Sequence, residues 1–237
     1  MAVALVTTGT EGAAASGDVT VGAPASPSTN DVWICAVHST DNVAHTFTDW
    51  TELFQANGGG SLSRLSVWYH RYAGSTPNLT VGHTAGDTII AGIASWSGVK
   101  TSGSPANVVG SGGGGTDMSI EHTAITPGVD NCMILAIFGI DDNRRVTEHS
   151  GYTPALEDTA DAGADAYVTN LGTDGAVGIH YLLQGTAADT GTITTTIDGA
   201  AGTRNWASVL IALEPAAVAA ATSLLFRPVP MMPFLVR

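Results

Sequence analysis

The chain is short of basic residues. Its 237 residues include 8 Lys and Arg against 21 Asp and Glu, which gives a net charge of −13, and Lys100 is the only lysine. A surface that follows a nucleic-acid backbone needs clustered Lys and Arg, yet only Arg144 and Arg145 are adjacent. We therefore expect no nucleic-acid partner, and an acidic surface that keeps subunits soluble and repels anionic polymers.

Long apolar runs are also missing. No stretch reaches the ~18 apolar residues that a membrane span requires. The first residues have no basic segment and no long apolar segment of the kind found in secretion signals. We therefore expect no membrane partner and synthesis in a cytoplasm. Hydrophobic residues still make up 44% of the chain, enough for a substantial core.

Cysteine is scarce, with only Cys35 and Cys132 present. Both fall on expected core strands at nearly matching places in the two halves described below, and two buried thiols are the favoured interpretation. A disulfide between the halves is the alternative. A metal pair is disfavoured because neither cysteine has another ligand nearby at zinc spacing.

Catalytic and metal-binding motifs are absent. The seven histidines form no HxH, HxxxH or HExxH pattern, and there is no Gly-x-Ser-x-Gly. The glycine runs at 58–60 and 112–115 lack the Gly-Lys-Ser/Thr that follows in a phosphate-binding loop, so we interpret them as turns and linkers. We expect a protein that is not an enzyme and has no catalytic residue, no cofactor and no metal.

Carboxylates are the one abundant chemical resource. They are able to form a glycosidase pair or to bind calcium, but no EF-hand spacing is present, and solvated acidic loops are the favoured interpretation. The two groups are Asp141, Asp142 and Glu148, and Glu157, Asp158, Asp161 and Asp165.

The chain repeats itself. Asp31-Val-Trp-Ile-Cys-Ala-Val is echoed from Asp130, Val67-Trp-Tyr-His-Arg-Tyr-Ala-Gly74 from Gly178, and Ile89-Ile-Ala-Gly-Ile-Ala-Ser-Trp96 from Trp206. The offset between the halves grows from 99 to 111 to 117. Such growth indicates loops that lengthen while the strands keep their order.

Strand patterns dominate both halves. Residues 31–39, 63–73, 88–96, 132–140 and 191–198 are β-branched, aromatic or alternating runs of strand length. These patterns predict an all-β, jelly-roll-like sandwich over residues 1–214. Its halves are about 1–100 and 117–214, joined by a Gly-rich connection at 101–116. Two small separate sandwiches are the alternative.

The last segment, residues 215–237, differs in composition. Its prolines favour an extended backbone. Its composition is too apolar for a disordered linker, which would be polar. We expect a C-terminal arm that docks on a partner subunit, or folds back on its own sandwich. The predicted docking residues are Leu224, Leu225, Phe226, Pro228, Pro230, Met231, Met232, Pro233, Phe234 and Leu235.

Five tryptophans lie within or beside the expected core strands: Trp33, Trp50, Trp68, Trp96 and Trp206. Large rings are ordinary core filling, and that is the favoured interpretation. An exposed platform that stacks on sugars is the alternative.

Several segments resemble β-sandwich structural proteins of tailed bacteriophages. They are Asp31-Val-Trp-Ile-Cys-Ala-Val, Asp49-Trp-Thr-Glu-Leu53, Leu65-Ser-Val-Trp-Tyr-His-Arg-Tyr-Ala-Gly74 and Ile90-Ala-Gly-Ile-Ala-Ser-Trp-Ser-Gly-Val99. The resemblance is stronger over 31–99 than over 130–213. It implies a virion protein, chiefly a capsid decoration (cement) protein that contacts the major capsid protein or other virion subunits. By resemblance it also implies a homo-oligomer, in particular a trimer. A carbohydrate- or receptor-binding module of a phage tail or fibre is the alternative.

Overall fold

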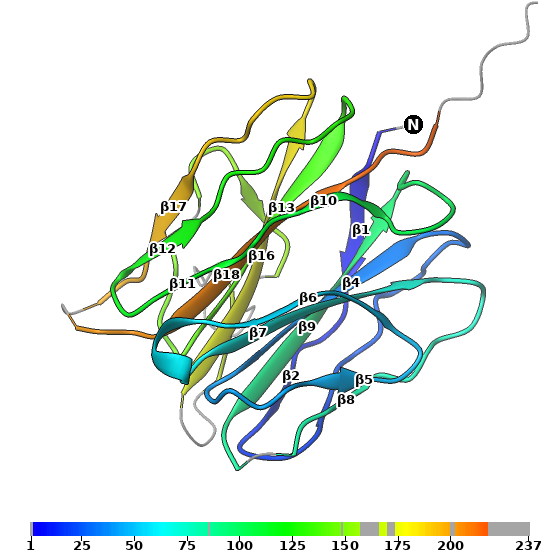
Figure 1. The fold of residues 1–237 in the computed structure, drawn as a ribbon. Helices are drawn as coiled ribbons and strands as arrows, with labels where there is room; N and C mark the ends of the chain where they lie inside the picture. Colours follow the sequence, from blue (N-terminus) through cyan, green and yellow to red (C-terminus); the bar gives the residue numbers. More distant parts are fainter. Residues whose placement is uncertain are drawn as a thin grey trace, which may run out of the picture.

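Two large antiparallel sheets, each drawn from one half of the chain, make up most of the computed structural model (Figure 1). The structure describes residues 2–84, 86–147, 149–156, 166–169, 174–199 and 202–217. The first sheet has the order β1 (Ala4–Thr8), β9 (Ile89–Ser97), β4 (Val32–Ser39), β7 (Arg64–Arg71) and β6 (Thr51–Asn57), and β2 (Gly12–Ala14) also pairs with β9.

The second sheet repeats this order. It runs β10 (Ala106–Val109), β18 (Trp206–Leu213), β13 (Cys132–Ile140), β16 (Gly175–Gln184) and β14 (Thr153–Pro154). In addition, β11 (Gly113–Gly115) pairs with β18, and β15 (Tyr167–Thr169) pairs with β16.

Each half adds a small sheet. In the first half β3 (Val19–Thr20), β8 (Thr80–Gly82) and β5 (Thr46–Phe47) pair in that order, and in the second half β12 (Ser119–His122) pairs with β17 (Ile193–Thr196). The helix in the described part of the chain is a single 3-10 turn, η1 (Gly59–Ser61).

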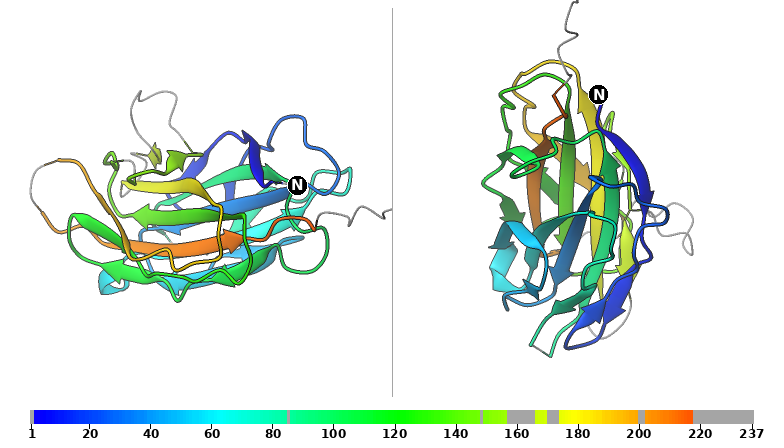
Figure 2. Two further views of the ribbon diagram at one scale, coloured as in Figure 1. Left: turned by 90° about the horizontal axis from the view of Figure 1, so that it is seen from above. Right: turned by 90° about the vertical axis from the view of Figure 1, so that its right-hand side faces the viewer.

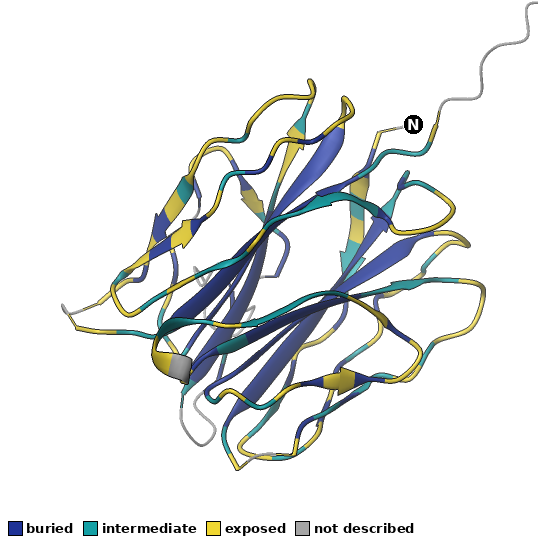
Figure 3. Cartoon of the chain, viewed as in Figure 1, coloured by how far each residue is buried: buried dark blue, intermediate teal, exposed yellow. Residues whose placement is uncertain are grey.

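The sheets stack in four layers (Figure 2). The large sheets face each other across one core that draws on both halves, including Ile34 and Val67 from one and Leu135 and Val209 from the other. Each small sheet covers the outer face of its own large sheet over a further apolar cluster. The central strands are therefore buried on both faces (Figure 3), which explains their continuous apolar sequences.

The strand register is the same in the two halves. Val32 on β4 lies opposite Arg71 and Trp96, as Met133 on β13 lies opposite Leu183 and Leu213. This pairing fixes the sum of the β4 and β7 offsets at 213 and that of the β4 and β9 offsets at 218; with 117 kept for β9, the offsets are 101 for β4 and 112 for β7. The offsets predicted for the first two, 99 and 111, do not fit this pairing.

The all-β sandwich is confirmed, and the five strongest strand predictions each coincide with a strand. The jelly-roll arrangement is not confirmed, since each large sheet is drawn from one half of the chain. Cys35 and Cys132 are both free and buried, so the interpretation as thiols is confirmed. They are not equivalent positions, however, because Cys35 matches Ala136 in the register.

The Gly-rich connection at 101–116 is more ordered than predicted. It contains β10, and its glycines 113–115 form β11, which pairs with Ser208, Ala207 and Trp206. Glycine is required here because a Cβ on Gly115 would lie 2.5 Å from the Trp206 ring. The interpretation of these glycines as a simple linker is therefore wrong.

No helix in the described residues is long and apolar enough to cross a membrane.

Candidate functional site

A largely apolar concavity lies at the end of the sandwich where the described chain stops. This terminal groove has a volume of about 720 Å³ and is lined mainly by small and apolar side chains beside one ion pair. Its residues are Ala2, Lys100, Thr101, Ser102, Val129, Asn131, Glu214, Pro215, Ala216 and Ala217.

Backbone bonds hold the start of the C-terminal segment against this groove. Val99 and Pro215 form an isolated β-bridge, and the Ala216 N–H donates to the Gly98 carbonyl at 2.7 Å. The Lys100 ammonium pairs with the Glu214 carboxylate at 3.0 Å on the rim. The segment therefore leaves the sandwich beside the N-terminal strand, as Figure 1 shows.

Exposed apolar side chains gather toward the same end of the second large sheet. Val129 is 36% exposed. Near the end of the ladder between β13 and β16, Leu182 is 37% exposed and Leu183 is 44% exposed. The predicted docking residues, from Leu224 to Leu235, lie outside the described residues. What the structure adds is the place from which their segment starts.

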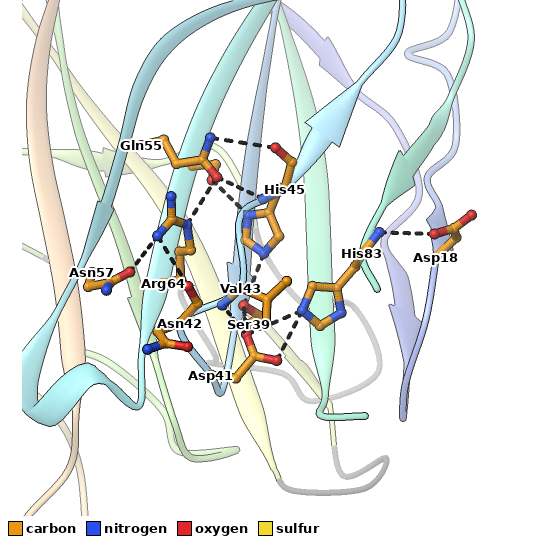
Figure 4. A network of polar contacts seen from close by, with 11 residues as sticks. Asp18, Ser39, Asp41, Asn42, Val43, His45, Gln55, Asn57, Arg64 and His83 are labelled. Atoms are coloured by element: carbon orange, nitrogen blue, oxygen red, sulfur yellow. Dashed lines mark hydrogen bonds and ion pairs between the residues drawn. The ribbon is translucent and has the colours of Figure 1, made fainter. Parts of the chain in front are cut away.

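A buried polar network under the first small sheet is a second candidate (Figure 4). His45 Nδ1 is 2.7 Å from Ser66 Oγ, and His45 Nε2 is 3.0 Å from Ser39 Oγ. The Ser39 hydroxyl donates to Asp41 at 3.0 Å. Ser39 thus accepts from His45 Nε2–H, which leaves Nδ1 to accept from Ser66.

This chain has the order hydroxyl, imidazole, hydroxyl, carboxylate. It differs from a Ser-His-Asp triad because the carboxylate reaches the imidazole through Ser39. Ser66 and His45 are 0% and 1% exposed, so no substrate has access to the hydroxyl. Burial also lowers the pKa of His45 to about 3, which makes it a weak base. The network holds the fold together and offers no accessible nucleophile.

The Asp41 carboxylate accepts several hydrogen bonds in this region. His83 Nε2 lies 3.2 Å from it, and the Val43 N–H donates to it at 3.0 Å. Burial raises the pKa of Asp41, but the hydrogen bonds from Val43, His83 and Ser39 outweigh it and hold the pKa below its ordinary value.

A second histidine cluster, missed by the sequence analysis, lies under the small sheet of the second half. His122, His149 and His180 are all 0% exposed. The His149 ring centroid is 4.8 Å from that of His122 and 4.7 Å from that of His180. Their separation by 27 and 31 positions hides the cluster from any spacing motif. The one sequence clue was that His180 falls near His70 in the repeat.

Of the predicted acidic residues the structure describes Asp141 and Asp142, and other side chains engage both of them. Asp141 accepts from the Asn205 backbone at 2.8 Å and from the Asn205 side chain. Asp142 forms ion pairs with Arg144 and Arg204. Burial raises the pKa of Asp141. Glu148, Glu157, Asp158, Asp161 and Asp165 lie outside the described residues.

The five tryptophans are buried, at 8% exposure or less, which confirms their interpretation as core residues. Phe47 and Trp50 stack at 4.5 Å in the outer layer of the first half, and Trp33 is fully covered below them. A sugar-binding platform of tryptophans is therefore not presented by this structure.

Within the described ranges, no group of three or more His, Cys, Asp or Glu side chains is placed to hold a metal ion. Comparisons with models of known protein families, with curated proteins and with solved structures find no match for the chain.

Proposed function

We propose that the chain is a non-enzymatic structural protein of a virus particle, of the capsid-decoration kind found in tailed bacteriophages. The observation that carries the proposal is the terminal groove together with the chain that leaves it. A rigid double sandwich ends in an apolar surface, and a segment rich in Leu, Met, Phe and Pro starts there.

Several other features support an assembly role. The acidic, lysine-poor composition favours solubility of the free subunit. The polar network around His45 is buried, and the acidic side chains of the 141–142 loop are engaged by Asn205 and Arg204. The chemistry of the described residues thus serves folding, while the apolar end is left for contacts with other virion subunits, including the major capsid protein or further copies of this chain.

The test uses particles of the phage that encodes the chain. Mass spectrometry of purified virions is expected to detect the chain at a fixed ratio to the major capsid protein, and cryo-electron microscopy to show the double sandwich on the shell. A chain that ends at Ala217 is expected not to bind when it is added back to particles that lack the full chain. Virions without the chain would overturn the proposal.

A receptor-binding module of a tail or fibre is the second candidate. One observation favours it: a concave surface of about 570 Å³ in the second half carries hydroxyl, amide and carboxylate groups suited to sugars, among them Gln184, Asp189 and Thr194. A glycan array that gives specific binding, lost in Asp189→Ala, would favour this candidate over decoration.

A further inference from the structure

The three histidines of the second outer layer occupy positions where the first half has apolar side chains. His180 lies opposite Ala136 on β13, as Trp68 lies opposite Cys35 on β4. These pairs are related by the offsets of 112 and 101 that the register gives when Trp96 and Leu213 are taken as equivalent positions of the repeat. His180 therefore stands in the place of a core tryptophan.

The turn before β14 gives the second equivalence. The Tyr152 N–H donates to the His149 carbonyl at 2.9 Å, as the Trp50 N–H donates to the Phe47 carbonyl at 3.4 Å. In both turns the residue before the ring, Gly151 or Asp49, has a positive φ, of 81° and 70°. His149 thus matches Phe47.

The small sheets give the third. On β12 the burial alternates from Ile120 through exposed Glu121 to His122, as in the first half it alternates from Val19 through Thr20 to Val21. His122 thus matches Val21. Since one half of this chain packs the site with Val, Phe and Trp, the fold itself does not require histidines there.

The contact between two of the rings depends on proton count. His149 Nδ1 lies 2.6 Å from His180 Nδ1, with both side chains buried. One proton between these nitrogens makes a hydrogen bond, with one ring as donor and the other as acceptor. If both rings carry a proton at Nδ1, two N–H groups point at each other and the contact is repulsive.

His149 is tied to the outer layer by its neighbours in sequence. Val146 bridges Ile197, and the Thr147 N–H donates to the Thr196 carbonyl at 2.9 Å on β17. His122 lies on β12, the partner of β17. The cluster therefore joins the outer layer, through His122 and His149, to β16 of the large sheet, through His180.

We propose that His122, His149 and His180 form an acid-sensitive latch. With one proton between His149 and His180 the β12–β17 layer is held on the second large sheet, and a second proton releases it. The inference does not depend on the proposed function.

The other groups around the cluster do not offset a second proton. Tyr152 faces His149, and its burial raises its pKa to about 12, so it stays neutral. Glu121 lies on the exposed side of β12, and β13, β17 and β18 carry no Asp, Glu, Lys or Arg. Glu148 lies outside the described residues. Burial lowers the pKa of His122 to about 3 and that of His149 to about 2.

The test is hydrogen exchange of the full chain followed by mass spectrometry at pH 7.5 and pH 5.5, corrected for intrinsic rates. Release returns the pKa of His122 and His149 from about 3 and about 2 to the ordinary value of about 6.5, and these two groups together are expected to reduce the protection of β12 and β17 about 100-fold. In the first outer layer His45 is the histidine whose pKa burial lowers strongly, so the hydrogen-exchange protection of that layer is expected to fall only about tenfold. Equal losses in the two layers would overturn the latch.

The internal repeat supplies the variants. His122→Val, His149→Phe and His180→Trp together copy the first half, and the β12–β17 layer is then expected to keep its protection at pH 5.5. His149→Phe alone is expected to reduce the fall from about 100-fold to about tenfold. His70→Gln, at the half-buried histidine, is the matched control and is expected to behave as wild type. A layer that opens in the triple variant as in wild type would refute the proposal.

Two measurements on the unmodified protein cover the case in which the variants do not fold. Nitrogen-15 NMR of the histidine rings is expected to show His149 and His180 neutral at pH 7.5, sharing one proton at Nδ1. Elemental analysis is expected to find no transition metal in the purified protein. Stoichiometric zinc would overturn the latch, because a metal would then take the place of the proton.

Discussion

Burial lowers the pKa of several histidines in this protein, His38 and His45 among them. His38, which faces the core between the large sheets, bonds to Ser63 at 2.8 Å, and burial lowers its pKa to about 3. His45 is held by two serine hydroxyls. The sequence did not predict either arrangement, because the partners lie 25, 21 and 6 positions away along the chain. The burial of the tryptophans was predictable, because ring size alone favours the core.

Ser66→Ala tests the buried hydrogen bond between Ser66 and His45 Nδ1. The variant removes the hydroxyl that donates to His45 Nδ1 and leaves a buried acceptor without a partner. A loss of about 1–3 kcal/mol in the free energy of unfolding is expected, measured by urea denaturation at pH 7.5. Ser16→Ala on the surface is the control and is expected to stay within about 0.5 kcal/mol of wild type. Equal stability of the two variants would contradict this hydrogen bond.

The sequence predicted strands whose side chains form a pattern. It missed strands, such as β11, that have no side chains to form one. β13 spans the predicted residues 132–140. The prediction was possible because a continuous apolar run of that length in an all-β chain indicates a buried strand. β11 consists of three glycines and has no pattern to detect. Only the packed structure reveals its constraint: the Gly58 backbone passes so close that a Cβ on Gly114 would lie 2.6 Å from the Gly58 Cα.

Gly114→Ala tests whether β11 is a packed strand. The added methyl group meets backbone, which moves less readily than a side chain, so the free energy of unfolding is expected to fall by about 1–3 kcal/mol. Gly86→Ala is the matched control, since a Cβ there meets nothing within 4 Å. Thermal and urea unfolding of both variants provide the measurement. A neutral Gly114→Ala would restore the interpretation of this segment as a flexible linker.

At the scale of the molecule, the duplication gives two copies of one architecture with different fillings. The repeat was visible in sequence, and so was the need to bury two half-sized sheets. Of the small outer sheets only β17 was predicted, within residues 191–198, because the other strands are only two to four residues long and carry little pattern. The same strand order, built twice, places an aromatic cluster over one large sheet and a histidine cluster over the other. Function is therefore sought where the halves differ, namely in the histidine cluster and at the terminal groove.

The buried histidines make the whole molecule acid-labile. Burial lowers the pKa of His38, His45 and His122 to about 3 and that of His149 to about 2, against about 6.5 in the unfolded chain. Because the folded pKa is the lower one, this stability is complete above about pH 6.5 and is lost as the pH falls toward the folded values.

Each of these histidines then lowers the free energy of unfolding by about 1.4 kcal/mol for each pH unit below about pH 6. The four together lower it by at most about 5 kcal/mol per pH unit. A domain of ordinary stability, about 5–15 kcal/mol, is therefore expected to unfold between about pH 3 and about pH 5. Protonation of Asp41, whose pKa is lowered, adds to the loss at still lower pH, while Asp141, whose pKa is raised, opposes it. Urea denaturation at pH 7.5, 6.5, 5.5 and 5.0 measures the slope. A free energy of unfolding that stays constant over this range would mean that the four histidines are not buried together in the native protein.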